Sequence, residues 1–311
     1  MMRTTLAWTA TDIPDQTGRT AVVTGANGGL GLETARELAR KGAHVVMAAR
    51  NLDKARTAAQ DLRASVTDAS IEVAALDLGS LESIAAFADL VGAAHPSIDI
   101  LVNNAGVMAT PRLETSDGFE VQFGTNHLGH FALTGRLLPA LRAAPAARVV
   151  GVTSTGRHFR WLYDDADIHL EKRYHPWRAY GRSKIANVHF AIELDRRFRK
   201  ARERAQSLVA HPGFANTDLQ AASARSTPGG RSQHFFRRAV ERVGTSAAEG
   251  ALPQLRAATD PRARGGELYT PRWVNVGPPV RRPLTRWSVD AKAMKQLWDI
   301  SEELTGVTFD L

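Results

Sequence analysis

The 311-residue chain contains no cysteine. This absence excludes disulfide bridges, thiolate catalysis and cysteine-ligated metal sites, and it is typical of a cytoplasmic protein. Long apolar runs are also missing, since no stretch approaches the roughly 18 residues that a membrane-spanning helix needs. The first residues carry one arginine but lack the apolar core of a secretory signal. We therefore expect a cytoplasmic protein without a membrane partner.

Lysine is scarce as well, because only 7 of the 40 basic residues are lysines, although the formal net charge is +8. A basic surplus can indicate nucleic-acid binding. Here the arginines are spread along the chain, and no zinc-finger spacing, RNA-binding motif or basic-leucine heptad accompanies them. The surplus is typical of solvated helix faces and is compatible with attraction of an anionic phosphate ligand. We expect no nucleic-acid partner.

Apolar strand-like runs alternate with helical patterns along the chain. Strands are expected at residues 20–24, 43–49, 71–76, 98–103, 148–153, 207–211 and 266–270, with helices between them that include residues 81–91, 117–142, 180–201 and 246–259. Continuously apolar strands separated by single helices predict a parallel sheet that is covered on both faces. The fold class is therefore α/β: a single-domain, Rossmann-like, doubly wound parallel β-sheet with helices on both faces.

No linker or internal repeat divides the chain. We therefore expect one dinucleotide-binding catalytic domain over residues 1–311, with an N-terminal extension at residues 1–17. Residues 221–244 are weakly periodic and contain Pro-Gly-Gly, which predicts a substrate flap. Residues 278–311 are expected to form a tail with a helix near residues 289–304.

A glycine-rich stretch, TGANGGLG, spans residues 24–31, between the first expected strand and the first helix. Such glycines permit a tight turn and a close approach of the backbone to a pyrophosphate at the helix N-terminus. Its position favours a nucleotide site over a glycine-rich turn of an unrelated α/β protein. The residues predicted to hold the cofactor here are Gly25, Asn27, Gly28, Gly29, Leu30 and Gly31.

The ends of the second and third strands indicate which dinucleotide binds. An NAD site usually offers an acidic group to the ribose 2′-hydroxyl, but the second strand ends in Arg50 and Asn51. Arg50 can pair with a 2′-phosphate, so we predict NADP (NADPH) over NAD, the alternative being a merely solvent-exposed arginine. Asp77, followed by Leu78, is placed to accept a hydrogen bond from the adenine amino group, or else it is a helix-capping or turn residue.

Tyr180 and Lys184 lie four residues apart and so share one face of any helix that carries them. A nearby cation favours the phenolate and lowers the pKa of a tyrosine, which is a way to make it a general acid and base. Only one of the 4 tyrosines has a lysine at this spacing. The alternative is an ordinary contact on the surface of a helix.

Taken together, these motifs resemble the short-chain dehydrogenase/reductase superfamily, across about residues 18–275. The matching residues are TGANGGLG at 24–31, Asp77-Leu78, Asn103 to Gly106, Asn126, Ser154, Tyr180 with Lys184, and His211-Pro212-Gly213 with Thr217. Residues 117–131 and the 26-residue interval from Ser154 to Tyr180 look like the retinol-dehydrogenase and protochlorophyllide-reductase-like branch.

The resemblance implies a role for each matching residue. Tyr180 would exchange a proton with the substrate oxygen, Lys184 would lower its pKa and bind the nicotinamide ribose, and Ser154 would hydrogen-bond the same substrate oxygen. Asn126 would hold a water in a proton relay, or it is a buried amide. The other residues implied to bind the cofactor are Asn104, Ala105, Gly106, Pro212, Gly213 and Thr217. No metal is expected in the reaction.

The chain departs from its resemblance in two ways that bear on the substrate. It lacks the cysteine of protochlorophyllide reductases and shows no N-terminal anchor of the kind found in membrane-bound retinol dehydrogenases. The substrate pocket is expected to use residues 157–177, residues 215–244 and the C-terminal tail, whose rings suit an apolar substrate or core packing. These rings are Phe159, Trp161, Trp177, Phe214, Phe235 and Phe236.

The helix with Tyr180 has two apolar stripes, Ile185-Val188-Ile192 and Phe190-Leu194-Phe198. One can face the sheet and the other a partner helix, which with the resemblance predicts a homodimer or homotetramer; the alternative is cover by the C-terminal tail of a monomer. We expect an NADP(H)-dependent oxidoreductase that interconverts a carbonyl and an alcohol on a small, apolar molecule. The alternatives are an NAD-preferring enzyme of the same class and a catalytically silent dinucleotide-binding regulator.

Overall fold

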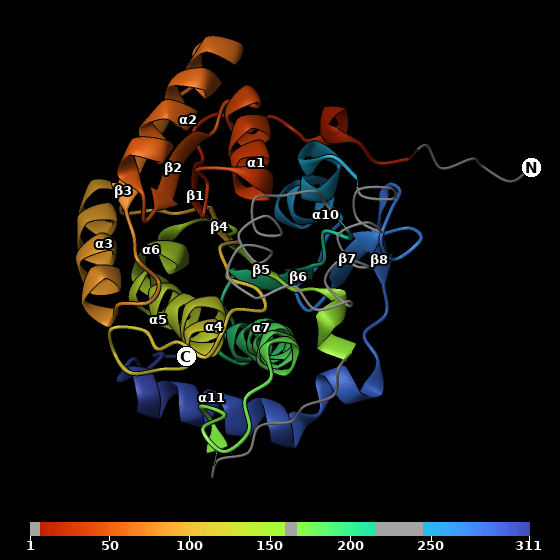
Figure 1. The fold of residues 1–311 in the computed structure, drawn as a ribbon. Coiled ribbons are helices and arrows are strands. Elements are labelled where there is room, and N and C mark those ends of the chain that lie inside the picture. Colours follow the sequence, from red (N-terminus) through yellow and green to blue (C-terminus); the bar gives the residue numbers. More distant parts are fainter. Residues whose placement is uncertain (1–6, 159–166, 215–244) are drawn as a thin grey trace, which may run out of the picture.

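The computed structural model describes residues 7–158, 167–214 and 245–311. Its centre is an eight-stranded sheet with the strand order β3-β2-β1-β4-β5-β6-β7-β8 (Figure 1). The strands are β1 (Thr20–Thr24), β2 (His44–Ala49), β3 (Ile71–Ala75), β4 (Ile100–Asn103), β5 (Arg148–Val152), β6 (Gln206–Ala210), β7 (Leu268–Pro271) and β8 (Pro279–Arg282). Strands β1 to β7 run parallel and β8 is antiparallel to β7. The doubly wound α/β prediction is thus confirmed.

The strand order reverses between β1 and β4, where Val22 pairs with Val46 on one side and with Leu101 on the other. All three side chains are fully buried. In an open parallel sheet, a ligand binds beyond the carboxyl ends of the strands at such a reversal, because the following connections diverge to opposite faces. The carboxyl ends of β1 and β4 are therefore the place to look for a site.

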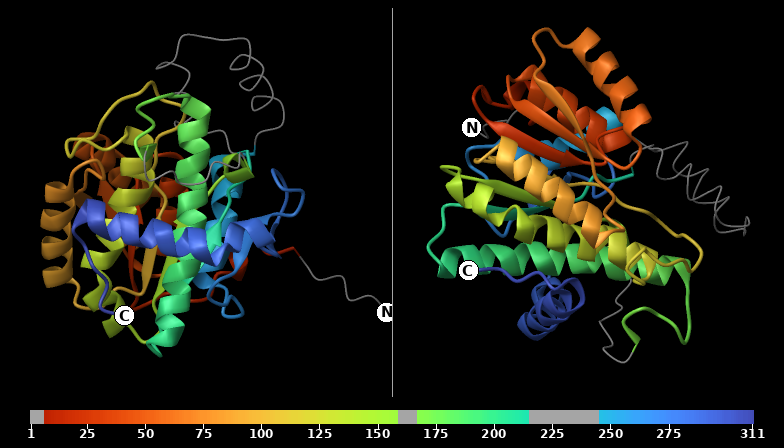
Figure 2. Two further views of the ribbon diagram at one scale, coloured as in Figure 1. Left: turned by 90° about the horizontal axis from the view of Figure 1, so that it is seen from below. Right: turned by 90° about the vertical axis from the view of Figure 1, so that its left-hand side faces the viewer.

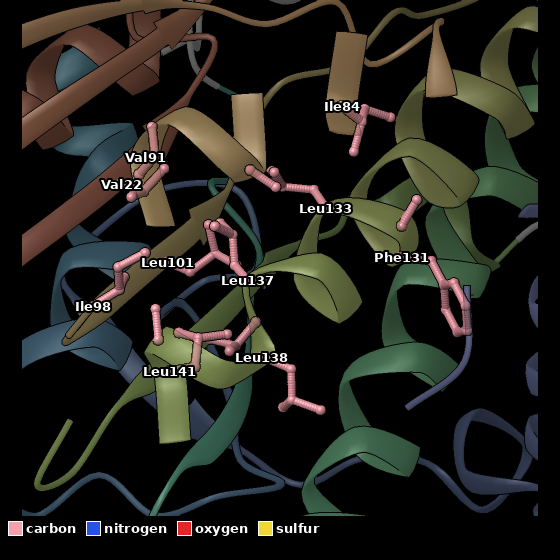
Figure 3. Close-up of a cluster of buried hydrophobic side chains, with 14 of the residues drawn as sticks. Val22, Ile84, Val91, Ile98, Leu101, Phe131, Leu133, Leu137, Leu138 and Leu141 are labelled. Carbon is pink, nitrogen blue, oxygen red and sulfur yellow. The ribbon is translucent and has the colours of Figure 1, made fainter. Parts of the chain in front are cut away.

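Helices cover both faces of the sheet (Figure 1). They are α1 (Gly29–Arg40), α2 (Leu52–Ser65), α3 (Leu81–Ala94), α4 (Val121–Phe123), α5 (Gly129–Arg136), α6 (Leu138–Ala143), α7 (Pro176–Lys200), α10 (Ala247–Thr259) and α11 (Ala291–Thr305). One buried cluster joins the sheet to α3, α5, α6 and α7 (Figure 3). A second cluster joins the opposite face to α1, α2 and α10. Burial of these two apolar layers is the main stabilising term of the fold.

The C-terminal tail is part of the core, because α11 lies across α7 (Figure 2). The Trp298 ring lies 5.2 Å from Phe131 and 5.9 Å from Phe190 between ring centroids, and Phe309 lies 4.7 Å from Trp298. On the other stripe of α7, Met294 of α11 joins the cluster of Val188. Both apolar stripes of α7 are therefore covered by other parts of the same chain, and neither is left for a partner helix. This arrangement matches the alternative in which the C-terminal tail covers this helix.

Two elements differ from the sequence prediction. The helix expected over residues 117–142 is divided into α4, a π-helical turn η2 (Gly124–Leu128), α5 and α6. Pro139 stands in the first turn of α6, where its missing N–H is tolerated, so it marks a new start. Strand β8 was not predicted, because it begins with a proline and the sequence PVRR shows no alternation of apolar and polar residues.

The segment before β1 is partly built into the fold. Trp8 and Ile13 are buried in the cluster on the α1 and α10 face, and a 3₁₀ turn, η1 (Ala10–Asp12), lies between them. The predicted flap at residues 221–244 lies outside the described residues. None of the described helices has both the length and the apolar character needed to cross a bilayer.

Candidate active site

A cleft of about 550 Å³ opens at the carboxyl ends of β1, β2 and β4. Its wall contains most of the residues that the sequence predicts to bind the cofactor: Gly25, Asn27, Gly28, Gly29, Leu30, Arg50, Asn51, Asp77, Leu78, Asn104, Ala105 and Gly106. Lining residues that the sequence did not indicate include Lys54, Val107, Met108, Thr110 and Thr125. The cleft has the location and the composition of a dinucleotide site.

The glycine-rich turn begins α1 at one wall of this cleft. Gly28 is the N-cap of α1, so the first backbone N–H groups of the helix are available to an anionic ligand. Gly31 was predicted to contact the cofactor, but it is not among the lining residues. A Cβ at Gly31 would stand 2.4 Å from the Gly25 oxygen and 2.7 Å from Asn104 Nδ2. Its role in the structure is therefore close packing of the turn against the end of β4.

Thr24, the last residue of β1, fastens the turn to the segment after β4. Its Oγ1 accepts hydrogen bonds from the backbone N–H of Asn104 at 2.9 Å and of Ala105 at 3.0 Å. Asn104 Nδ2 in turn donates to the Thr24 carbonyl oxygen at 2.8 Å. The two walls of the cleft are thus held at a fixed separation.

His130, which sequence reasoning missed, extends this connection to the catalytic side. Its Nδ1 lies 3.0 Å from the Asn126 carbonyl oxygen and its Nε2 lies 2.9 Å from Thr24 Oγ1. A carbonyl can only accept, so Nδ1 carries the proton and Nε2 accepts from the threonine hydroxyl. Burial lowers the pKa of His130 to about 4, and the charge of Lys184 acts in the same direction. A neutral imidazole in one tautomer therefore bridges β1 and the π-helical turn.

Two cationic residues stand together where β2 meets α2. Arg50 is exposed, and both Arg50 and Lys54 line the cleft. Asn51 Oδ1 accepts the backbone N–H of Lys54 at 2.9 Å, which makes Asn51 the N-cap of α2. Asp53, the acidic residue of this first turn, is 96% exposed. Arg50 and Lys54 therefore bring two positive charges to this corner of the cleft.

Asp77 stabilises a turn and also lines the cleft. Its Oδ1 accepts the backbone N–H of Gly79 at 2.9 Å, which is the turn role that the sequence left open. The same carboxylate lines the cleft beside Leu78. The turn fixes the side chain in the orientation in which it borders the site.

Tyr180, Lys184 and Ser154 form one group, and none of the three is among the residues that line the cleft, although Lys184 Nζ lies close to Gly106 of the cleft wall. Helix α7 begins at Pro176, one turn before Tyr180, and buries both Tyr180 and Lys184. The Tyr180 hydroxyl is hydrogen-bonded to the Ser154 side chain, and Lys184 Nζ lies 5.7 Å from the centroid of the Tyr180 ring. Lys184 Nζ also donates to the Val152 carbonyl oxygen at 3.3 Å. The three predicted side chains are therefore brought together.

Burial controls the protonation of this group. It raises the pKa of Tyr180 to about 12, although the hydrogen bond from Ser154 acts in the opposite direction. It lowers the pKa of Lys184 to about 8. The sequence predicted that Lys184 would lower the pKa of Tyr180, but the net shift in the structure is upward. The loss of water around the buried phenol is the main cause of this upward shift in the pKa of Tyr180.

Asn126 is fully buried in the π-helical turn η2, a local geometry that is frequent at functional sites. Its Oδ1 accepts the Val107 N–H at 2.7 Å, and its Nδ2 donates to the Val107 carbonyl oxygen and to Ser183 Oγ, each at 2.9 Å. The side chain thus joins the cleft wall to α7, as a buried amide would. A Cβ at Gly106 would lie 2.8 Å from Asn126 Oδ1 and 3.4 Å from Lys184 Nζ, so this glycine leaves room between the cleft and Lys184.

The segment after β6 lies apart from the described cleft wall. Pro212 and Gly213 are not among the lining residues. They follow β6 and are held to the turn after β7, where the Phe214 N–H donates to the Asn275 carbonyl oxygen at 3.1 Å. Thr217 lies outside the described residues.

The surroundings of Tyr180 are apolar on one side and cationic on the other. Trp177 meets Tyr180 edge to face with 6.2 Å between ring centroids, and Met108 packs in the same cluster. Arg157 is buried and donates from its guanidinium to the Ser154 carbonyl oxygen at 3.1 Å, a residue that no sequence motif indicated. Phe159, Trp161, Phe235 and Phe236 lie outside the described residues.

Comparison with known proteins agrees with this geometry. Residues 19–227 match the short chain dehydrogenase family. The chain is 43% identical to human retinol dehydrogenase 13 over 203 residues, which cover 65% of this chain and 60% of that protein. It is 36% identical to human retinol dehydrogenase 12 over 299 residues, which cover 94% of this chain and 88% of that protein.

Solved structures agree as well. An uncharacterized protein from Mycobacterium paratuberculosis is 40% identical with a TM-score of 0.81, covering 98% of this chain and 100% of that one. A protein from Beutenbergia cavernae, described as an NAD(P)-dependent gluconate 5-dehydrogenase, is 25% identical with a TM-score of 0.65, covering 82% and 95%. From its fold, its cleft and these relatives, the chain belongs to the short-chain dehydrogenase family of NAD(P)-dependent oxidoreductases, and resembles its retinol dehydrogenase branch.

Proposed function

We propose that this enzyme uses NADP(H) to interconvert a carbonyl and an alcohol, with Tyr180 as the general acid and base. The observation that carries the proposal is the hydrogen bond between the Tyr180 hydroxyl and Ser154, with the buried Lys184 beside them and Gly106 of the cleft wall next to Lys184. The dinucleotide, when bound, supplies or takes up the hydride. The protein then has to orient the substrate and manage one proton.

The phenol is the proton source in the reductive direction. A pKa of about 12 keeps Tyr180 protonated at neutral pH, so it can donate to a substrate oxygen as negative charge develops there. Ser154 offers a second hydrogen bond to the same oxygen. In the oxidative direction Tyr180 must be deprotonated, and an ammonium at Lys184 favours that state. Alcohol oxidation is therefore expected to gain from rising pH more than carbonyl reduction does, up to about pH 8, where Lys184 loses its charge.

The preference for NADP over NAD rests on Arg50 and Lys54. Both border the cleft where β2 ends, and a 2′-phosphate at this corner would face two cations. The Beutenbergia cavernae structure is described with bound NADP, which supports the same choice. An NAD-preferring enzyme is the alternative. A charge reversal of Arg50 to Asp should weaken NADPH binding at least about tenfold more than NADH binding, whereas an equal loss for both would favour the alternative.

An apolar substrate fits the side of the site that the structure describes. Trp177 and Met108 pack with Tyr180 in one apolar cluster. The relatives are named retinol dehydrogenases, and another, from mouse, is named polyprenol dehydrogenase at 43% identity over 211 residues. Retinol and polyprenols are both apolar alcohols. We therefore propose an apolar alcohol and its aldehyde or ketone as the substrate pair.

The mechanism is tested by following absorbance of the reduced cofactor against a panel of aldehydes, ketones and alcohols. Tyr180→Phe should abolish turnover and retain NADPH binding. Tyr269→Phe is a matched control, because it also removes one buried tyrosine hydroxyl. That hydroxyl donates a hydrogen bond to Glu267 at 2.8 Å, and Tyr269 does not line the cleft. Unchanged turnover in Tyr180→Phe would reject the mechanism. Absence of turnover in the wild type, with NADPH bound, would favour the silent regulator.

We also propose a cytoplasmic location and a homodimer or homotetramer. Since the sheet and α11 together cover both stripes of α7, the subunits would have to meet through another surface. Sedimentation at micromolar concentration should give a mass of two or four chains. Fractionation of expressing cells should leave the protein in the supernatant, and recovery with the membranes would contradict the location.

A further inference from the structure

Two histidines and a glutamate meet at the edge of the sheet opposite the cleft. His44 is the first residue of β2, Glu72 is the second residue of β3, and His95 is the C-cap of α3. These elements lie side by side (Figure 1). The cleft lies at the carboxyl ends of the strands, whereas His44 and Glu72 lie at their amino ends. The cluster is therefore separate from the proposed active site.

The three side chains converge on one point. His44 Nε2, Glu72 Oε2 and a ligand atom of His95 all lie within 4.8 Å of one another. His95 Nε2 is 2.8 Å and His44 Nε2 is 3.5 Å from the same glutamate oxygen. Ligands of a tetrahedral metal ion stand about 3.3 Å apart, as bond lengths near 2.0 Å require. The cluster approaches this spacing with small side-chain movements.

His44 is oriented as a ligand would be. Its Nδ1 lies 2.8 Å from Ser70 Oγ, while its Nε2 is buried and has no hydrogen-bond partner. Metal-binding histidines usually donate one ring N–H to such a neighbour, which fixes the tautomer and turns the other nitrogen toward the ion. An unpartnered buried nitrogen is costly, and a bound cation would satisfy it.

Charge and access also favour a cation. Glu72 contributes a carboxylate, and His95 ends α3, where the helix carbonyls carry partial negative charge. The side chains are 30%, 33% and 17% exposed for His44, Glu72 and His95, so an ion can enter from solvent and a water can complete its shell. From this donor set we propose that His44, Glu72 and His95 bind one Zn²⁺ ion, which clips β2, β3 and α3 together.

No sequence motif predicted this site, because each ligand comes from a different element and no short spacing relates the three residues. A zinc ion at this site would stabilise the fold and would take no part in hydride transfer. Zinc should therefore stabilise the protein without being required for turnover. Its binding is independent of the proposed function.

The test is a titration of the full-length, untagged protein with Zn²⁺ by calorimetry, with Co²⁺ absorbance to report tetrahedral coordination. Wild type should bind one ion per chain, and its melting temperature should rise with zinc concentration. His44→Gln and His95→Gln should each weaken binding at least about tenfold. His175→Gln is the matched control, since this histidine is exposed and its side chain makes no cap at the start of α7.

Circular dichroism and NADPH binding show whether each variant is folded. No binding at micromolar zinc, or equal affinity in wild type and in folded His44→Gln and His95→Gln, would overturn the proposal. In that case the cluster is only a hydrogen-bonded contact among β2, β3 and α3.

Discussion

Mild acid should destabilise this protein strongly, because three histidines are completely buried and neutral. Burial is the main cause that lowers the pKa of His127 to about 3, of His130 to about 4 and of His211 to about 3, from 6.5. At a pH between the folded-state pKa values and the ordinary pKa of 6.5, the three histidines are protonated in the unfolded chain and neutral in the folded chain. Their contribution to stability is therefore full above pH 6.5 and is lost as pH falls toward the folded values.

The size of the effect follows from this linkage. Between pH 7 and 5 each histidine lowers the free energy of unfolding by about 2 kcal/mol, and the three together by roughly 6 kcal/mol. That sum rivals the 5–15 kcal/mol that holds a typical domain folded, so partial unfolding near pH 5 is expected. Most carboxylates titrate below this range in both states, so the histidines dominate the slope.

Urea unfolding followed by tryptophan fluorescence at pH 7, 6 and 5 gives the slope directly. His130→Gln removes one titrating group and should flatten the dependence by about a third. His175→Gln, at an exposed site, should leave the slope of the wild type unchanged. An unfolding free energy that is constant from pH 7 to 5, or a His130→Gln slope equal to that of the wild type, refutes the reasoning.

Three further predictions concern the site. Gly31→Ala forces a Cβ to within 2.4 Å of the Gly25 oxygen, so it should lower stability by about 1–3 kcal/mol and weaken NADPH binding, as unfolding and fluorescence titrations would show. Ser183→Ala removes one of the two acceptors of the buried Asn126 Nδ2 and leaves only the Val107 carbonyl oxygen, so it should cost about 1–3 kcal/mol in urea unfolding; no change would contradict the bond. Lys184 loses its charge as pH rises through about 8, so NADPH affinity should fall by up to about tenfold per pH unit above that, and Lys184→Met should abolish this dependence in calorimetry.

The sequence predicted the central architecture because its signals are local. Seven parallel strands follow from continuous apolar runs, and Ser246 was correctly identified as the start of α10, where it forms a capping box with Glu249. The π-helical turn at Asn126 and strand β8 were missed. Both depend on tertiary packing, because the turn is held by Val107 and Ser183 and β8 by pairing with β7.

In the candidate site, too, the residues with local sequence signals were predicted, and those that depend on tertiary contacts were not. Most residues that line the cleft belong to short motifs that each follow a strand, so their convergence could be inferred from topology. His130 and Arg157 could not be singled out, since their roles come from contacts with Thr24 and Ser154 on other segments. The direction of the Tyr180 pKa shift was wrong for a related reason, because spacing along a helix says nothing about the water that folding removes.

Helix α7, which carries the proposed proton donor Tyr180, is held by several neighbouring elements, and this has a consequence for specificity. α7 packs on the sheet, carries α11 across its outer face, and is tied to the cleft through Asn126 and Ser183. A proton donor on such a rigid element keeps its geometry when neighbouring segments change. Variation in substrate among relatives is therefore expected to arise in the segments that follow β5 and β6. Exchange of residues 157–177 with those of a relative should change the preferred alcohol and leave NADPH affinity unchanged. A loss of cofactor binding in a folded exchange variant would show that the two ends of the site are not independent.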